Sequence, residues 1–246
     1  MSEKRDFDIT ICMPYFERRD RLEETIAQFR KLGYFEDYGL VLSIVDDGST
    51  KEPLSGHEDM FEGIELVFSR RPNKTNWECP SRPLNQAIRQ SNTPILLLQS
   101  PEIFHPKPII GRMIAGMTTF DSVVSVSTKM EGPGLKDRWY STAEHTVPFW
   151  WCQMMSRAFY NKVGGFDDDF SLGRGGEDVD FAIRASAAGA KWKWLKDGYV
   201  IHNLPERKWP DPNKDICPIC SRKDPNVQLL LKRHGTTGHR PAQEFI

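Results

Sequence analysis

The sequence predicts an α/β protein with a mostly parallel sheet that is covered by helices on both faces. Short apolar runs alternate along the chain with segments whose apolar residues recur at helical spacing, and this alternation favours such a sheet. The apolar runs are nearly continuous, which is typical of strands buried on both faces. With 246 residues, 39% of them hydrophobic, the chain can bury a large core.

The predicted elements follow one another from the N-terminus. Strands are assigned to apolar runs with β-branched residues, and Gly33 and Gly189 are expected to end two of the helices. The long, irregular stretch 130–151 is rich in Gly, Pro, Trp and His and is read as a functional loop. The expected strands are 7–13, 40–45, 64–68, 93–98, 122–127, 191–195 and 199–201; the expected helices are 20–32, one launched at 80–83, 107–119, 156–163, one from 177 to before 189, and 226–234.

Two adjacent acids, Glu177 and Asp178, are predicted to lie in the first turn of a helix, directly after the glycine-rich run Gly173-Arg174-Gly175-Gly176. One interpretation is that they only complement the helix dipole. The other depends on the glycines, because such backbone approaches a ligand closely and can move as a lid. A carboxylate beside such a loop suits a general base.

A second acidic pair, Asp46 and Asp47, follows the strand 40–45. Ligands of open α/β sheets collect at the carboxyl ends of strands, so the pair is a candidate binding site; an Asx turn is the alternative. Arg82 and Asn85 would lie one helical turn apart and face the same edge of the sheet. Trp139, Trp150 and Trp151 are either core residues or stacking surfaces for a sugar; both readings stay open.

Taken together, these residues resemble the GT-A glycosyltransferases, within the large inverting family (family 2) that includes the chondroitin, hyaluronan and cellulose synthases. The resemblance covers about residues 8–203 and implies a Rossmann-like GT-A domain. The segments that carry it are Met13-Pro14-Tyr15-Phe16-Glu17, Val45-Asp46-Asp47-Gly48-Ser49, Arg82 with Asn85, Gly164-Gly165-Phe166-Asp167 and Glu177-Asp178.

The resemblance implies roles for these residues. Tyr15 and Asp47 would hold the nucleobase, commonly uracil, and Arg82 and Asn85 would contact the nucleotide. Asp178 would be the catalytic base, with Glu177 beside it. Met13, Glu17 and Asp46, in the same segments, complete the expected nucleotide-binding set.

The expected metal site departs from the family pattern. In place of a D-x-D motif the chain has Gln99-Ser100-Pro101-Glu102, with a single acid. Glu102, phosphate oxygens and water can still hold Mg²⁺ or Mn²⁺. His202 matches the place where many GT-A enzymes supply another ligand, and imidazole suits Mn²⁺ better than Mg²⁺. We therefore expect a catalytic divalent cation; weak or lost metal binding is the alternative.

The expected reaction moves a sugar from a nucleoside diphosphate sugar, a UDP-sugar by resemblance, to an acceptor hydroxyl. Asp178 would take the proton of that hydroxyl as it attacks from the opposite face, which inverts the configuration. A glycoside hydrolase would instead need two carboxyl groups that flank the scissile bond. The acceptor class, whether glycan, protein or modified nucleic acid, is left open.

From residue 205 the composition changes, and we expect two units: a glycosyltransferase domain at 1–204 and a C-terminal appendage at 205–246. The appendage carries eight Lys and Arg against five Asp and Glu. Cys217, Cys220, His234 and His239 approach the spacing of a Cys₂His₂ zinc site, so a structural Zn²⁺ is expected; thiols without a metal are the alternative. A basic, zinc-bearing tail also suggests a second function, nucleic-acid binding on a GT-A scaffold.

Overall charge and hydropathy exclude other classes. The net charge is −1, so the composition as a whole does not indicate a polyanionic partner. The longest apolar runs are too short to cross a bilayer, and residues 1–8 are charged without the apolar core of a signal peptide. We therefore expect a cytoplasmic protein without a membrane span.

Overall fold

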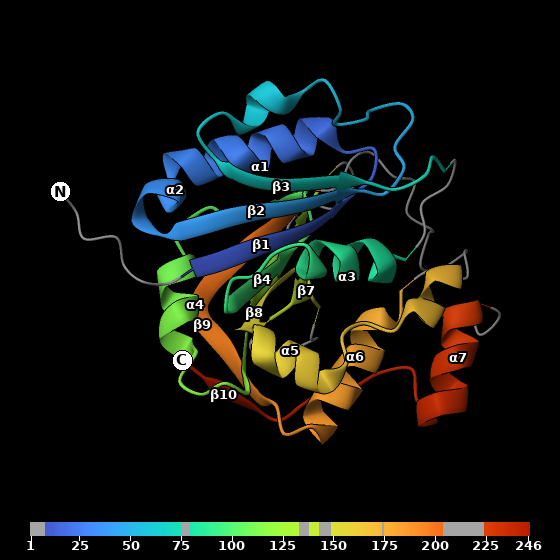
Figure 1. Ribbon diagram of the computed structural model, residues 1–246. Helices are drawn as coiled ribbons and strands as arrows, with labels where there is room; N and C mark the ends of the chain where they lie inside the picture. The colour runs from blue at the N-terminus through green and yellow to red at the C-terminus, as the bar shows by residue number, and fades with distance from the viewer. Residues whose placement is uncertain (1–7, 75–78, 133–137, 143–148, 174, 204–223) are drawn as a thin grey trace.

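A mixed β-sheet with helices on both faces forms the centre of the molecule (Figure 1). The computed structural model describes residues 8–74, 79–132, 138–142, 149–173, 175–203 and 224–246. The strands are β1 (Asp8–Tyr15), β2 (Gly39–Asp46), β3 (Glu65–Arg70), β4 (Ile95–Gln99), β5 (Ile103–Phe104), β6 (Ser122–Glu131), β7 (Arg138–Ser141), β8 (Cys152–Ser156), β9 (Lys191–Asn203) and β10 (Gln243–Phe245). The helices are α1 (Arg19–Lys31), α2 (Tyr34–Asp37), α3 (Ser81–Arg89), α4 (Ile110–Gly116), α5 (Arg157–Val163), α6 (Glu177–Ala187) and α7 (Pro225–His234), with 3-10 turns η1 (Glu58–Phe61) and η2 (Asp168–Leu172).

The strands follow the order β10-β9-β6-β8-β4-β1-β2-β3, with β5 paired to β9 and β7 to β6. The expectation of a mostly parallel sheet needs a correction, because β8 runs antiparallel to both β4 and β6. Strand β8 was not predicted; it lies between the stretch 130–151, read as a loop, and the helix expected from residue 156. β5 and β7 are also antiparallel to their partners, so the sheet is mixed.

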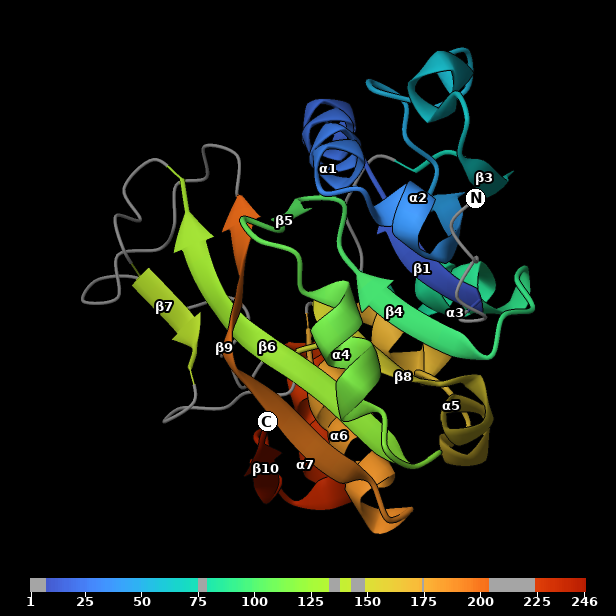
Figure 2. The ribbon, with the colours of Figure 1, turned by 90° about the vertical axis from the view of Figure 1, so that its left-hand side faces the viewer.

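Strand β9 replaces the two separate strands expected at 191–195 and 199–201. It runs alongside β6, and β10 pairs with its first half (Figure 2). Val126 pairs with Leu195 but the next residue, Ser127, pairs with Tyr199. The polar residues 196–198 therefore form a bulge within one strand, where the sequence suggested a turn between two.

Each face of the sheet has its own hydrophobic core, which explains the continuous apolar runs. On one face Leu22, Ile26 and Phe29 of α1 pack on the sheet, together with residues of α2 and α4. On the other face α3, α5 and α6 pack on the sheet, with Phe159 and Phe181 among the buried residues. Helices on both faces were predicted from the sequence, and this is confirmed.

The described part of the C-terminal segment joins this body. Strand β10 pairs with β9 in parallel, and α7 lies beside η2 and α6 (Figure 1). Residues 224–246 therefore add a strand to the sheet and pack beside α6. The division of the chain at residue 205 stays a prediction. In the described ranges, every helix is too short or too polar to cross a bilayer.

Candidate active site

The loop that follows β2 is built around the carboxylate of Asp46. This side chain is fully buried; Oδ1 accepts a hydrogen bond from Ser49 N at 2.8 Å and Oδ2 accepts one from Leu54 N at 3.3 Å. Arg70 Nε lies 3.6 Å from Oδ2. These bonds reach three and eight residues along the chain, whereas the Asx turn considered as an alternative would bond the residue two positions on. Asp46 thus stabilises its own loop through two backbone N–H groups.

Glu17 holds the same loop from the opposite side. Its carboxylate accepts hydrogen bonds from the backbone N–H groups of Thr50 (2.7 Å), Lys51 (3.0 Å) and Glu52 (2.6 Å). Burial alone would raise the pKa of Glu17, but these donors prevail and lower it. Glu17 has a φ of 50°, a left-handed conformation that is uncommon for residues other than glycine. This glutamate therefore fixes the loop after β1 against the loop after β2.

Asp47, the second acid of the pair, has a different environment. Its carboxylate forms an ion pair with Arg71 Nε at 2.8 Å and a second with Lys74 Nζ. The Lys74 ammonium also lies 4.7 Å from the centre of the Phe16 ring. Two cations therefore hold the buried Asp47 carboxylate at the carboxyl end of the sheet.

Met13 and Tyr15 are brought to the same edge, but their side chains are fully buried. The Tyr15 hydroxyl donates to Glu52 O at 2.5 Å, and Tyr15 O accepts from Asp47 N at 2.8 Å. These side chains belong to the core. Met13 and Tyr15 can therefore contact a ligand only through their backbone groups. Tyr15 also positions Asp47 through the backbone hydrogen bond between them.

Helix α3 places Arg82 and Asn85 in unlike surroundings. Arg82 is exposed, whereas Asn85 is buried. The Asn85 Nδ2 donates to Phe166 O at 2.7 Å and to Asp168 Oδ1 at 2.8 Å, and Oδ1 accepts from Phe166 N at 3.1 Å and from the Tyr160 hydroxyl. Asn85 thus ties α3 to the segment that leads into α6, a role that its spacing from Arg82 did not indicate.

Helix α6 begins at Glu177, as predicted, after Gly176 in a left-handed conformation with φ 90°. The Glu177 side chain is buried and Oε1 accepts a hydrogen bond from Trp150 Nε1 at 2.9 Å. Its Oε2 is buried as well and has no hydrogen-bond partner among the described residues. Trp150 was expected to be either a core residue or a stacking surface for a sugar. It is a core residue, and its indole N–H donates to the Glu177 carboxylate.

Asp178 is more accessible than Glu177 and accepts a hydrogen bond from Val179 N at 2.8 Å. Burial raises the pKa of Asp178, and the neighbouring charge of Glu177 raises it further, to about 8. Once deprotonated, a carboxylate with such a pKa is a stronger base than an ordinary carboxylate, which suits a general base that works near or above pH 8.

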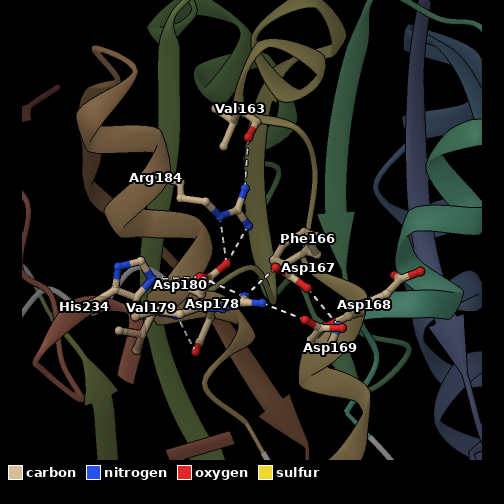
Figure 3. Close-up of polar contacts among 12 residues, drawn as sticks. Val163, Phe166, Asp167, Asp168, Asp169, Asp178, Val179, Asp180, Arg184 and His234 are labelled. Atoms are coloured by element: carbon tan, nitrogen blue, oxygen red, sulfur yellow. Dashed lines mark hydrogen bonds and ion pairs between the residues drawn. The ribbon is translucent and has the colours of Figure 1, made fainter. Parts of the chain in front are cut away.

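A cluster of charges is centred on Asp180, in the same first turn of α6 (Figure 3). Asp180 is buried and forms an ion pair with Arg184 at 2.6 Å, and its Oδ1 lies 2.8 Å from His234 Nε2. Arg184 also donates to Val163 O at 3.0 Å. This cluster was not predicted, although the i, i+4 spacing of Asp180 and Arg184 in the sequence is a signal for such a pair.

The tail histidines therefore have partners on α6. His234 contacts Asp180, and His239 Nε2 lies 2.8 Å from Ser186 Oγ. Cys217 and Cys220 lie outside the described residues. Among the residues that are described, no group of three or more His, Cys, Asp and Glu side chains could hold a metal. The structure thus gives no support to the expected zinc site, and zinc is not carried into the proposed function.

Glu102 and His202, the expected ligands of the catalytic cation, do come together. Asn203 N donates to Glu102 O at 2.9 Å, and His202 Nε2 lies 3.3 Å from Glu102 Oε1. Burial would raise the pKa of Glu102, but the hydrogen bond and the charge of His202 lower it to about 2. The Trp151 ring packs against the imidazole in a T-shaped arrangement, with ring centres 4.4 Å apart.

This pair fits two ligands of a divalent cation. Ligand atoms at about 2.1 Å from a cation, on neighbouring corners of an octahedron, lie about 3 Å apart, close to the observed separation. His202 Nδ1 is buried and unpaired within the described part of the chain. A carboxylate and an imidazole are also a donor set that suits Mn²⁺.

Comparison with known proteins identifies the family. The sequence matches the family described as glycosyl transferase family 2 over residues 10–176, more than half of the chain. The chain belongs to glycosyl transferase family 2. A second match, to the family described as N-terminal domain of galactosyltransferase, covers residues 152–204. Among curated proteins, none matches the sequence significantly.

Solved structures support the same fold. TarS from S. aureus is 18% identical with a TM-score of 0.62, covering 80% of this chain and 36% of that one. The mannosyltransferase PcManGT from Pyrobaculum calidifontis, in complex with GDP-Man and Mn²⁺, is 18% identical with a TM-score of 0.64, covering 81% and 58%. TarS 1-349 in complex with UDP is 17% identical with a TM-score of 0.63, covering 80% and 61%.

This chain therefore spans between about a third and three fifths of the length of those structures. The predictions of a GT-A-like fold and of a glycosyltransferase are confirmed at the level of family and fold. The inverting mechanism, the donor and the roles of individual residues remain proposals.

Asn85→Ala should lower the free energy of unfolding by about 1–3 kcal/mol, because it leaves buried groups of Phe166 and Tyr160 without their partner. The matched control is Arg82→Ala, an exposed change on the same helix, which should stay within about 0.5 kcal/mol. Urea denaturation followed by circular dichroism measures both. Equal stability of the two variants would contradict the role assigned to Asn85.

Proposed function

We propose that the protein is an inverting glycosyltransferase that moves a sugar from a UDP-sugar to an acceptor hydroxyl, with Asp178 as general base. The observation that carries the proposal is Asp178 itself. This half-buried carboxylate, bonded to Val179 N at the start of α6, has a raised pKa, in a chain of family 2. Glu177, buried and bound to Trp150, lies directly beside it in the chain.

Asp47 is proposed to bind the nucleobase, because a carboxylate at this edge can accept the imide N–H of uracil. Arg71 and Lys74 keep that carboxylate in place. Met13, Tyr15, Glu17 and Asp46 are proposed to act through the loops that they shape. One similar structure contains UDP and another GDP-Man, which supports a nucleotide-linked donor and leaves the identity of the base to be tested.

Arg82 and Asn85 were both expected to contact the nucleotide, but we assign them different roles. Exposed Arg82 is proposed to contact the diphosphate, because a guanidinium binds phosphate oxygens strongly. Asn85 is proposed to act indirectly, by holding the segment that leads to Asp178. Only the first of them should change donor affinity directly.

Glu102 and His202 are proposed to hold a divalent cation, Mn²⁺ or Mg²⁺, together with the donor diphosphate. Such a cation offsets the charge of the leaving diphosphate. The presence of Mn²⁺ in the complex of the mannosyltransferase supports this assignment. Asp178 takes the proton of the acceptor hydroxyl, and the hydroxyl oxygen forms the new bond as the bond from the sugar to the diphosphate breaks.

The described tail residues give no reason to prefer nucleic-acid binding. The Arg233 guanidinium is paired with Asp167 and, at 2.7 Å, with Asp169, and His234 is paired with Asp180. Basic side chains that are neutralised within the protein contribute little to attraction of a polyanion. Transfer to a modified nucleic acid remains one of the acceptor classes to test.

Asp178→Asn should lower kcat by at least about 10²-fold, because the amide cannot accept the proton of the acceptor. Its affinity for UDP should stay within about twofold of the parent, since Asp178 is not assigned to the donor. Release of UDP from UDP-sugars, in the presence of candidate acceptors, measures turnover, and calorimetry measures affinity. Asp37→Asn, an exposed acid on α2, is the control. Parent-like turnover in Asp178→Asn would remove this residue from the role.

Chelation by EDTA should abolish turnover, and Mn²⁺ should restore it better than Mg²⁺. In His202→Ala the preference for Mn²⁺ should weaken, because the nitrogen ligand is lost. Electron paramagnetic resonance of Mn²⁺ in the presence of UDP gives a readout that is independent of turnover, with His57→Ala as control. Full turnover in EDTA, or unchanged Mn²⁺ binding in His202→Ala, would rule out this site.

A further inference from the structure

Helix α7 lies against the glycine-rich loop that leads into α6. A Cβ atom added to Gly173 would lie 2.4 Å from Asp224 Oδ1 and 2.8 Å from Asn226 Cγ. At Gly176, whose φ is +90°, it would lie 3.1 Å from Leu230 Cδ1. Gly173 and Gly176 therefore leave space for the α7 segment. This packing explains the two glycines without requiring that the loop move or approach a ligand.

Asn226 makes the most direct connection between the helix and the loop. Its side chain is fully buried, and Nδ2 donates to Phe170 O at 2.6 Å and to Gly175 O at 2.7 Å. The first acceptor precedes the loop, and the second lies three residues before Asp178. The Asn226 Oδ1 is buried and without a partner among the described residues. An unpaired buried oxygen costs free energy. The favourable contribution of this side chain therefore comes from the two hydrogen bonds that Nδ2 donates.

The other end of α7 is attached to both sides of the same loop. Arg233 pairs with Asp167 and, at 2.7 Å, with Asp169, which lie before the loop. His234 lies 2.8 Å from Asp180, which follows Asp178 by two residues. Between the two ends of the helix, Leu230 packs with Phe170 and Cys79. The helix thus spans the loop that carries the base and is bound to it at several points.

We propose that Asn226 is a positioning residue for Asp178 and that α7 is a brace that fixes the base in its catalytic orientation. The inference rests on the proposed function of Asp178. Neither family match includes α7, since they end at residues 176 and 204. The brace is therefore supplied by a segment of this chain that lies outside the matched regions. Loss of the Asn226 bonds frees Gly175 O and lets the backbone at the start of α6 move.

The prediction for Asn226→Ala is a loss of turnover without a loss of donor binding. Misplacement of a catalytic group by about 1 Å can cost about 10²-fold in rate, so kcat should fall about 10- to 100-fold. The KM for the donor should stay within about twofold, because Asp47 and Arg82 are untouched. A variant that was merely less stable would keep the kcat of its folded fraction.

The test compares the full-length parent with Asn226→Ala and with Lys232→Ala, an exposed change on the same helix. Hydrogen–deuterium exchange of residues 168–182 is measured together with kcat and KM. Exchange in this segment should become faster in Asn226→Ala and stay unchanged in Lys232→Ala. Arg233→Ala, at a less buried position, is the second variant and should act in the same direction if Asn226→Ala does not fold.

Three results separate the possible failures. Parent-like kcat and exchange in both Asn226→Ala and Arg233→Ala, with Asp178→Asn inactive, would overturn the brace and leave the proposed function intact. Faster exchange with unchanged kcat would show a structural contact only and would overturn the positioning role. A parent without turnover on any UDP-sugar would remove the proposed function, and the positioning role with it.

Discussion

The repulsion between the adjacent carboxylates of Glu177 and Asp178 is the interaction on which the proposed chemistry depends. Glu177 is buried, is bound to Trp150 through one oxygen and has its other oxygen unpaired within the described chain. Burial raises the pKa of Asp178 most, and the adjacent carboxylate of Glu177, in surroundings with little screening, raises it further. An exposed acid of ordinary pKa would be a weaker base at neutral pH.

The scaffold must hold this unfavourable pair in place, and three elements contribute. From α3, Asn85 holds the segment before η2; from within α6, Arg184 pairs with Asp180; from the C-terminal segment, α7 packs on the glycine loop. Asn85 and α7 contact the segment that leads into α6, and Arg184 reaches Asp180 from the last turn of that helix. On the other side of the site Glu17 and Asp46 fix the loops that present Asp47. The carboxylates of Glu17 and Asp46 thus accept hydrogen bonds from backbone N–H groups, whereas that of Asp178 is proposed to react.

Much of this arrangement could be predicted from local sequence, because it depends on short-range rules. Apolar runs, helical periodicity and the glycine before Glu177 located most of the strands and the start of α6. The antiparallel β8, the bulge in β9 and the position of α7 depend on pairing between distant segments, which no local pattern specifies. The same limit explains Asn85: its spacing from Arg82 indicated a shared face, whereas its hydrogen bonds go to Phe166 and Asp168, about 80 residues away.

The pH dependence of kcat/KM in the parent and in Glu177→Gln tests the central claim most directly. The account predicts that kcat/KM of the parent falls as the pH decreases through about 8, because Asp178 becomes protonated. Glutamine keeps an acceptor for Trp150 but removes the charge, so the pKa of Asp178 should drop and the fall should move to lower pH. An identical pH profile in both proteins, or a parent profile that falls only near pH 4, would contradict it.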